Sequence, residues 1–199
     1  MVFGISGNYR FILASRSPRR QELLREAGFD FEVKEVDYDE KFPETLEGKE
    51  IAEFLSLEKA RSFLKKEVLP DEVIITADTI VWCNGKVLDK PNNYSEAFDI
   101  LSQISGNTHE VITGVTILSA AKFHTFSETT IVKFDILSDE MIDNYIKNCK
   151  PFDKAGAYGI QEWIGVVGNS YIEGSYFNVM GLPVNRLIRE LRSFLAGQI

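Results

Sequence analysis

Residues 12–28 read ILASRSPRRQELLREAG, and they predict a short buried strand that turns directly into a helix. The apolar run that begins at Phe11 forms the strand. Ser17 suits the N-cap, because its hydroxyl can accept an amide hydrogen two or three residues on. Pro18 suits the first helical position, where an N–H would have no partner in the helix. The residues expected on the buried face and at the end of this helix are Leu23, Leu24, Ala27 and Gly28.

The charge of this first helical turn is unusual. Helix N-termini favour acidic residues, because the helix dipole leaves partial positive charge there. This helix carries Arg19 and Arg20 instead. Two guanidinium groups, backbone amides and the hydroxyls of Ser15 and Ser17 would converge on one place. The pattern predicts an anion site, and a phosphate group fits it best.

Composition limits the classes of function. The chain has 199 residues, 44% hydrophobic and 26% charged, which indicates one domain or two closely fused lobes, and we treat residues 1–199 as a single domain. No apolar run approaches the ~20 residues that span a bilayer, and the N-terminus lacks a signal-peptide pattern. We therefore expect a cytoplasmic protein with no membrane partner, in which Cys83 and Cys149 are reduced packing residues. His109 and His124 are too isolated to predict a zinc site.

The formal net charge of −8 argues against a surface that coats DNA or RNA. It also opposes long-range attraction of an anionic ligand. Binding of a phosphate group would therefore need a local cluster of basic residues, or a divalent cation that bridges carboxylates to phosphates.

The rest of the chain alternates strand and helix patterns. Predicted strands cover residues 29–36, 71–78, 80–83, 86–88, 110–119, 128–137 and 164–172. Predicted helices cover residues 49–66 and 93–104 and begin again at Ser138 and Pro183, with structured loops at 37–48, 150–161 and 174–183. Hairpins and helical crossovers occur together, so the fold class is α/β with a mixed twisted sheet and flanking helices.

A hairpin links three candidate residues. The apolar strand 71–78 leads into the tripeptide ADT, which places Asp78 and Thr79 where we expect this strand to leave the core. An Asn-Gly pair at 84–85 predicts a two-residue turn. In that register Lys90 faces Thr79 and lies near Asp78. The same register pairs Cys83 with Lys86 and Val81 with Leu88.

The helix predicted at 49–66 carries a lysine on its apolar side. Lys59 falls between Leu55 and Phe63 on the helical wheel. Its ammonium group either extends past its neighbours to water or projects into a cleft between the two lobes. The other residues of the apolar arc are Ile51 and Phe54.

Each candidate also has an ordinary structural interpretation. The two arginines can face solvent and pair with Glu22 or Glu26 in weak surface ion pairs. Asp78 can cap its own hairpin, and Gln161 can be a solvated loop residue.

Seven motifs occur together in a fixed order. They are SRSPRR, EKA, ADT, DKP, SGNTHEVITGV, KAGAYGIQ and GSYFNVMGLP. In this order they resemble the Maf family, the septum-formation proteins that act as nucleoside triphosphate pyrophosphatases, over residues 12–187. The resemblance implies a fold like that of the inosine triphosphate pyrophosphatases, with two lobes around a central cleft. It also implies hydrolysis of a nucleotide to its monophosphate and pyrophosphate with a divalent metal, Mg²⁺ or Mn²⁺.

The resemblance also assigns roles to residues of this sequence. It implies that Asp78 accepts the proton of the attacking water, and we expect a metal to be held by Asp78 and Glu40. Lys59 and Lys90 resemble the family's phosphate-facing lysines. The substrate-binding residues expected from the motifs are Ser15, Ser17, Arg19, Arg20, Thr79 and Gln161, of which Arg19, Thr79 and Gln161 occupy the specificity positions. Arg16 and Asp89 depart from the usual family pattern, and neither is a proposed catalytic group.

The expected activity is hydrolysis of dTTP or UTP. AGAYGIQ with its glutamine resembles the dTTP/UTP subgroup, and a side-chain amide can match the imide edge of uracil or thymine. A pyrophosphatase of the 7-methyl-GTP type and a non-catalytic nucleotide-binding regulator of cell division remain open, as do modified pyrimidine nucleotides and assembly as a homodimer. Neither a P-loop motif nor a dinucleotide-binding glycine motif occurs in the sequence, so a P-loop kinase and a Rossmann dehydrogenase fit worse.

Overall fold

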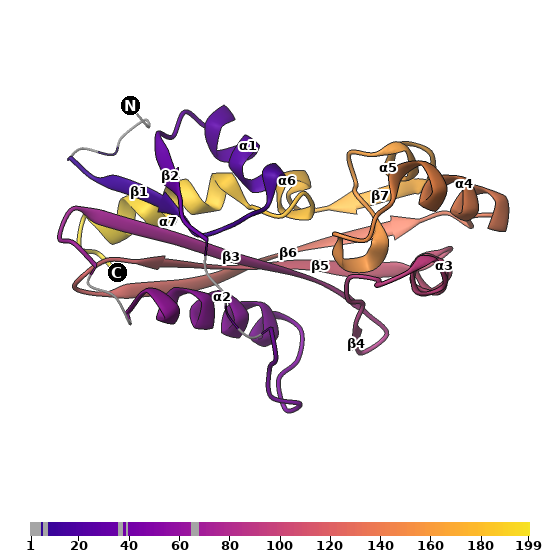
Figure 1. Ribbon diagram of the computed structural model, residues 1–199, viewed down its shortest axis with the longest axis horizontal. Helices are drawn as coiled ribbons and strands as arrows, with labels where there is room; N and C mark the ends of the chain where they lie inside the picture. Colours follow the sequence, from indigo (N-terminus) through magenta and orange to yellow (C-terminus); the bar gives the residue numbers. More distant parts are fainter. Residues whose placement is uncertain (1–4, 6–7, 36–37, 39, 65–67) are drawn as a thin grey trace. The chain divides into compact units, whose positions relative to one another are not determined.

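The computed structural model describes residues 5, 8–35, 38, 40–64 and 68–199. Within these residues the strands form one seven-stranded sheet in the order β2-β1-β3-β5-β6-β7, with β4 paired to β3 (Figure 1). The strands are β1 Arg10–Leu13, β2 Phe31–Val33, β3 Glu72–Cys83, β4 Lys86–Val87, β5 Thr108–Leu118, β6 Phe123–Phe134 and β7 Asn169–Glu173. The helices are α1 Pro18–Glu26, α2 Lys49–Leu64, α3 Tyr94–Ile104, α4 Asp139–Cys149, α5 Trp163–Gly168, α6 Tyr176–Val179 and α7 Val184–Leu195, with a 3₁₀ turn η1 at Ala155–Ala157.

The sheet is mixed, which confirms the predicted α/β class. Strand β1 pairs in parallel with both β2 and β3. Strand β3 pairs antiparallel with β4, and β6 pairs antiparallel with β7.

The chain divides into two compact units, each built from separate segments of sequence. The first unit comprises Met1–Asp78, Thr113–Glu128 and Gly181–Ile199. The second comprises Thr79–Ile112 and Thr129–Met180. The boundaries fall inside β3, β5 and β6, so these three strands contribute residues to both units.

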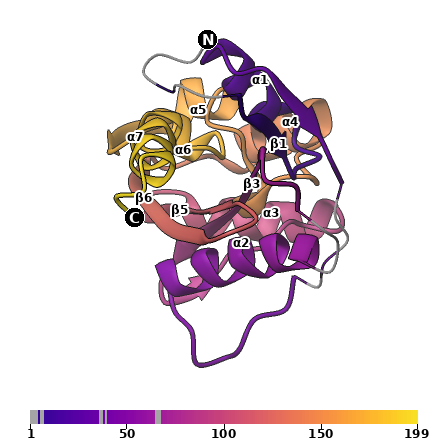
Figure 2. The same ribbon diagram turned by 90° about the vertical axis from the view of Figure 1, so that its left-hand side faces the viewer.

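Helices cover both faces of the sheet in the first unit. Helix α2 lies on one face, and α1 and α7 lie on the other (Figures 1 and 2). A buried cluster joins α2 to the strands beneath it, and its members are Ile12, Ala14, Ala60, Phe63, Ile74 and Leu118. Strand β5 approaches α2 so closely that a Cβ atom on Gly114 would lie 2.1 Å from the carbonyl oxygen of Ala52. Only glycine fits that approach.

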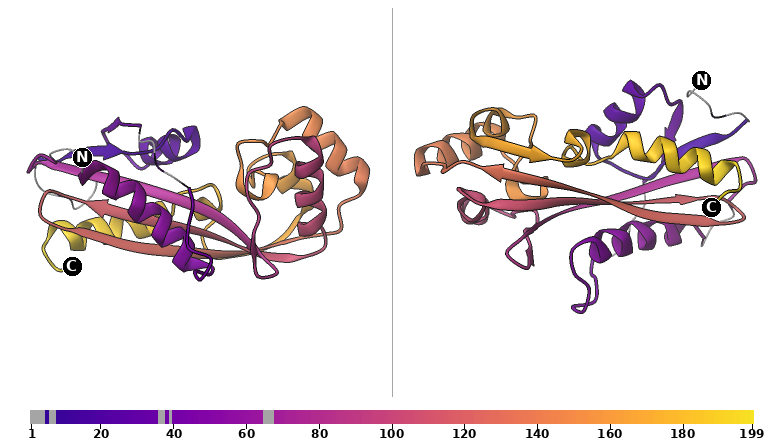
Figure 3. Two further views of the ribbon diagram at one scale, coloured as in Figure 1. Left: turned by 60° about the horizontal axis from the view of Figure 1, so that its bottom comes forward. Right: turned by 180° about the vertical axis from the view of Figure 1, so that it is seen from behind.

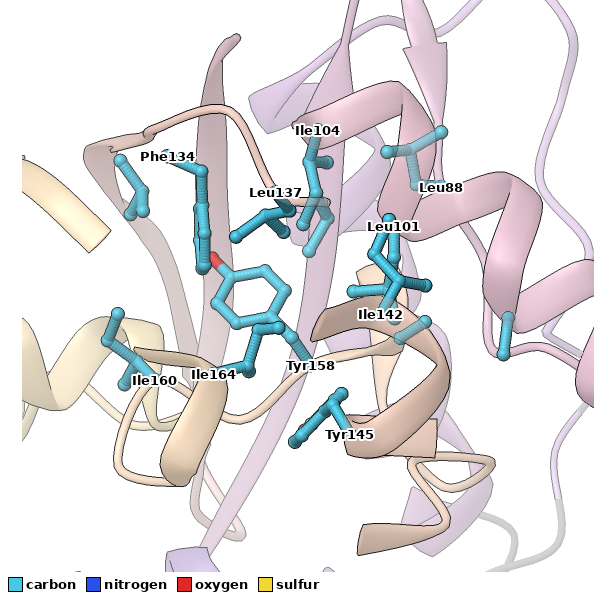
Figure 4. Packing of buried hydrophobic residues seen from close by; sticks show 14 of the residues in the cluster. Leu88, Leu101, Ile104, Phe134, Leu137, Ile142, Tyr145, Tyr158, Ile160 and Ile164 are labelled. Atoms are coloured by element: carbon cyan, nitrogen blue, oxygen red, sulfur yellow. The ribbon is translucent and has the colours of Figure 1, made fainter. Parts of the chain in front are cut away.

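The second unit has its own apolar core. Helix α3 packs against α4 (Figure 3), and α5 and the loop before it complete the cluster. Figure 4 shows the ring of Tyr158 within this cluster, beside Phe134 and Ile164. His109 also lies here, only 2% exposed, and its Nε2 is 2.7 Å from the hydroxyl of Tyr158.

Several predicted local structures are confirmed. Ser17 caps α1, and Gly28 adopts a positive φ of 79° just after the helix. The Asn-Gly turn is present, with positive φ at both residues, and Cys83 pairs with Lys86. The N–H of Leu88 donates to the carbonyl of Val81 as the predicted register requires. Asn93, where the helix predicted at 93–104 begins, caps α3, because its Oδ1 accepts the N–H of Glu96 at 3.0 Å.

Other predicted boundaries were wrong. Strand β3 does not end at ADT but continues through Asp78 and Thr79 to the hairpin turn. The strand predicted at 29–36 is ordered as a strand only over Phe31–Val33, and residues 36 and 37 lie outside the described residues. The helix predicted at 49–66 agrees with α2 over Lys49–Leu64, and residues 65 and 66 of its predicted extent lie outside the described residues. The stretch 174–183, predicted as a loop, contains the short helix α6.

The strand predicted at 164–172 begins as helix α5, and β7 follows only at Asn169. Valines in this segment favour a strand, but packing overrides that preference. A Cβ atom on Gly165 would lie 2.0 Å from the carbonyl oxygen of Ile160. On Gly168 it would lie 2.6 Å from the side chain of Leu137. The two glycines let this segment coil tightly against its own loop and the core.

Candidate active site

The turn between β1 and α1 has the hydrogen bonding expected of a capped helix start. Ser15 Oγ accepts the N–H of Ser17 at 3.2 Å, and Ser17 Oγ accepts the N–H of Arg20 at 3.5 Å. Both hydroxyls act as acceptors in these bonds. Each therefore keeps its own hydrogen, which it can donate to an anion.

Arg20 is a buried residue that ties three segments of the first unit together. Its Nε donates to the carbonyl of Gly181 at 2.7 Å, and its Nη1 donates to the carbonyl of Ala77 at 2.8 Å. The same Nη1 lies 3.3 Å from Ser15 Oγ. Burial lowers the pKa of Arg20, while the negative charge of Asp78 acts in the opposite direction. The solvent-facing pair with Glu22 or Glu26 is thus the wrong interpretation for Arg20.

Arg19 is half-buried, and its charge contributes to lowering the pKa of the neighbouring Arg20. Two cations held close together repel each other, and an anion between them would relieve that repulsion. The exposed Arg16 instead pairs with Glu35 at 2.9 Å. The predicted anion site therefore centres on Arg19, Arg20 and the two serines.

Lys59 and Asp78 form a pair in the first unit, and Asp78 is the last residue of β3 that belongs to that unit. Lys59 is 8% exposed, and its Nζ lies 3.2 Å from Oδ1 of Asp78 and 3.0 Å from the carbonyl oxygen of Ala77. Burial lowers the pKa of Lys59, and Asp78 opposes that change. Lys59 therefore does not extend to water, as one interpretation of the sequence had it, but directs its charge at Asp78.

Tyr38 completes this group. Its hydroxyl donates to Oδ1 of Asp78 at 2.7 Å and lies 3.4 Å from Oε1 of Glu40. The ammonium group of Lys59 lies 4.4 Å from the centre of the Tyr38 ring, a cation–π contact. Burial raises the pKa of Tyr38, and the carboxylate of Asp78 raises it further, so the hydroxyl keeps its proton.

The two carboxylates suit a hard divalent cation. Asp78 and Glu40 both lie within reach of one phenolic hydroxyl, and carboxylate oxygens are the ligands that Mg²⁺ and Mn²⁺ prefer. Among the described residues no group of three or more His, Cys, Asp and Glu side chains forms a metal cage. This donor set fits an ion that takes its other ligands from water and substrate phosphates, as Mg²⁺ commonly does.

Three predicted site residues belong to the second unit. Thr79 is half-buried in β3 directly after Asp78. Lys90 is exposed beyond the end of β4. Gln161 is exposed in the turn before α5. The expectation that Lys90 points at Asp78 links one unit to the other and stays a prediction.

The structure thus groups most of the predicted site within the first unit. Arg20 and Lys59 both donate to the carbonyl of Ala77, and Lys59 also contacts the carboxylate of Asp78. No sequence pattern indicated Tyr38, because a tyrosine in an acidic loop carries no signal for a partner forty residues away. The carbonyl of Gly181 could not be predicted either, since a backbone acceptor leaves no trace in residue type.

The profile of the family described as Maf-like protein matches residues 10–194. The chain belongs to the Maf-like protein family. The match includes every residue of the candidate site, from Ser15 to Gln161.

Curated relatives align over most of their length with this Maf-like chain. A Phocaeicola vulgatus protein named dTTP/UTP pyrophosphatase is 52% identical over 185 residues, which cover 92% of this chain and 95% of the relative. A Bacteroides fragilis protein of the same name is 48% identical over the same shares of the two chains. A Cytophaga hutchinsonii protein, also of that name, is 50% identical over 96% of this chain and 87% of its own length.

A solved structure, that of the Staphylococcus aureus Ham1 protein, matches 96% of this chain and all of its own. The TM-score is 0.48 and the sequence identity is 13%. The α/β assignment rests on the sheet described above.

Cys83 and Cys149 are both free thiols, as expected. Among the described residues, none of the helices has the length and apolar content needed to cross a membrane.

Proposed function

We propose that this protein hydrolyses dTTP and UTP to the monophosphate and pyrophosphate. The observation that carries the proposal is the convergence of Lys59 and Tyr38 on Asp78, with Arg20 held beside the same strand. The names of relatives about 50% identical over nearly the whole chain support the same activity.

The reaction needs an activated water and neutralised phosphate charge. Water adds to phosphorus, the anhydride bond between the α- and β-phosphates breaks, and pyrophosphate leaves. A divalent cation held by Asp78 and Glu40 would lower the pKa of that water and offset charge on the phosphate oxygens. Asp78 takes the water proton in this proposal.

Tyr38 and Lys59 hold Asp78 for that task. Both contact the same oxygen, Oδ1, at 2.7 Å and 3.2 Å. Because two donors from different segments of the first unit bond to Oδ1, the carboxylate cannot rotate freely and Oδ2 is the oxygen left over. We therefore assign Oδ2 to the attacking water. A general base that is already oriented avoids the free-energy cost of orienting that group during the reaction.

The basic residues supply positive charge that an acidic chain otherwise lacks. Arg19 and Arg20 lie at the N-terminus of α1, where the helix dipole adds to their charge. We assign the triphosphate to these residues and to Lys59, with Lys90 as a further phosphate contact. Thr79 and Gln161 are assigned to the pyrimidine base of the nucleotide.

A panel of nucleoside triphosphates tests the proposal. With Mg²⁺ or Mn²⁺ present, we expect dTTP and UTP to yield monophosphate and pyrophosphate in equal amounts, with CTP, GTP, ATP and 7-methyl-GTP hydrolysed more slowly. A preference for 7-methyl-GTP would assign the protein to the other pyrophosphatase type. Binding of dTTP without any product would support the non-catalytic regulator instead.

We also propose that the protein acts in the cytoplasm, since reduced cysteines are typical of that compartment. Sedimentation of the purified protein distinguishes a monomer from the homodimer that the sequence leaves open.

A further inference from the structure

A tight turn in the second unit displays Gln161. The carbonyl of Gly159 accepts the N–H of Glu162 at 2.9 Å, which closes a four-residue turn with Ile160 and Gln161 at its centre. Ile160 is 4% exposed and packs in the core, whereas Gln161 is exposed. The turn therefore buries Ile160 in the core and exposes the side chain of Gln161.

A single hydroxyl bonds both ends of this turn. The hydroxyl of Tyr145, on α4, accepts the N–H of Gly159 at 3.0 Å. The same hydroxyl donates its hydrogen to Oε2 of Glu162. The Tyr145 ring is fully buried in the cluster that also holds Ile160 (Figure 4). The hydroxyl thus connects the first and last residues of the turn to the core.

Lys154 holds the other oxygen of the same carboxylate. Its Nζ is 3.1 Å from Oε1 of Glu162, and it also contacts Asp153 at 2.7 Å. Lys154 is only 8% exposed. Because both carboxylate oxygens of Glu162 have donors, its side chain has little freedom to move.

The side chain of Glu162 bonds to the turn and not to its own helix. Glu162 occupies the N-cap of α5, yet its side chain makes no capping hydrogen bond. It reaches back toward Tyr145 instead, past Gly159. A Cβ atom at Gly159 would lie 2.8 Å from the carboxyl carbon of Glu162, so glycine leaves the space that the carboxylate fills.

We propose that Tyr145, Glu162 and Lys154 are positioning residues that set the base preference of the site by fixing the turn that carries Gln161. The inference rests on the proposed function, in which Gln161 reads the base. A side-chain amide discriminates uracil from cytosine only if its donor and acceptor meet the correct base atoms. A displacement of about 1 Å is enough to lose such a hydrogen bond.

The variant Tyr145→Phe tests this directly, because it keeps the ring in the core and removes only the hydroxyl. We expect the ratio of kcat/KM for UTP to that for CTP to fall about tenfold, the worth of one well-made hydrogen bond. The loss should appear mainly in KM for UTP, because the residues around Asp78 are untouched. Lys154→Met should lower the same ratio, and Glu162→Gln, whose amide oxygen can still accept the phenol, should retain more of it than Glu162→Ala.

Tyr158→Phe is the matched control. It also removes a buried tyrosine hydroxyl from the same core, but that hydroxyl meets His109 and not the turn. We expect it to lower the melting temperature without changing the UTP to CTP ratio.

The results distinguish a failure of the proposed function from a failure of this inference alone. If the wild-type protein hydrolyses neither UTP nor dTTP, the proposed function and this inference fall together. If the wild type prefers UTP and Tyr145→Phe keeps that preference, the inference alone is overturned. Should Tyr145→Phe fail to fold, the ratio measured with Glu162→Ala decides in the same way, because that variant removes the same anchor.

Discussion

The ammonium group of Lys59 lies 3.2 Å from Oδ1 of Asp78, and both side chains are largely buried. Helix α2 supplies the lysine, and the central strand β3 supplies the aspartate. A pair of buried charges is a costly way to stabilise a fold, since desolvation offsets much of the attraction. Its position beside Arg20 instead favours a role in binding and chemistry.

Lys59→Met tests the contribution of that charge. We expect kcat/KM for UTP to fall about 100-fold, because the phosphate oxygens lose a positive charge that is poorly screened in this partly buried site. Steady-state pyrophosphate release measures the change. Lys147→Met, which removes an exposed lysine paired with Asp143 on α4, is the control and should stay within about twofold of wild type. A Lys59→Met enzyme with full activity would contradict the proposed site.

Tyr38→Phe tests the hydrogen bond to Asp78. The ring and its contact with Lys59 remain, so only the donor at 2.7 Å is lost. We expect kcat to fall about tenfold with little change in KM, because Asp78 is held less firmly. Tyr94→Phe removes another tyrosine–aspartate hydrogen bond, on the surface between α3 and α4, and should leave kcat unchanged. Equal kcat values for wild type and Tyr38→Phe would remove Tyr38 from the site.

Gly114→Ala tests the close approach of β5 to α2. The new Cβ would lie 2.1 Å from the carbonyl oxygen of Ala52, so backbone must move. We expect the free energy of unfolding to fall by about 3 kcal/mol, measured by urea denaturation. Gly28→Ala adds the same methyl group where nothing lies within 4 Å, so its cost is limited to the positive φ, roughly 1–2 kcal/mol. Similar losses in the two variants would contradict the packing described here.

His109 makes stability depend on pH. Burial lowers its pKa from 6.5 to about 4, so between these values the unfolded chain binds a proton that the folded protein does not. Stability should therefore fall as the pH drops from about 6.5 to about 4, by roughly 3 kcal/mol in total from this residue.

The measurement is urea denaturation of wild type and His109→Gln across that range. Carboxylates titrate alike in both proteins, so the difference between the two curves isolates His109. We expect the stability advantage of the wild type to shrink toward low pH. A difference that does not change with pH would mean that His109 is protonated in the folded protein.

Local patterns predicted the first unit well. The strand–Ser–Pro–Arg order forecast β1, the cap at Ser17 and the start of α1, because each depends on residues only a few positions apart. In the second unit, the Asn-Gly turn and the start of a helix at Asn93 were equally local, and both are present.

Features that depend on distant contacts were not predictable in this way. The valines before β7 favour a strand, and only the packing of Gly165 and Gly168 turns the segment into α5. The candidate site was likewise only partly predictable from residue types. Residue types indicated Asp78 and Lys59, whereas the approach of Tyr38 and the bonding of Arg20 to backbone carbonyls arise from tertiary structure alone.

The measurement that tests the central claim most directly compares Asp78→Asn with wild type, with UTP and Mg²⁺. Asparagine keeps an acceptor for Tyr38 and Lys59 but cannot take the water proton. We predict that release of pyrophosphate falls about a thousandfold or more while UTP binding, measured by calorimetry, changes little. Asp99→Asn, an exposed aspartate on α3, should behave as wild type. Pyrophosphate release by Asp78→Asn at the wild-type rate would contradict the account.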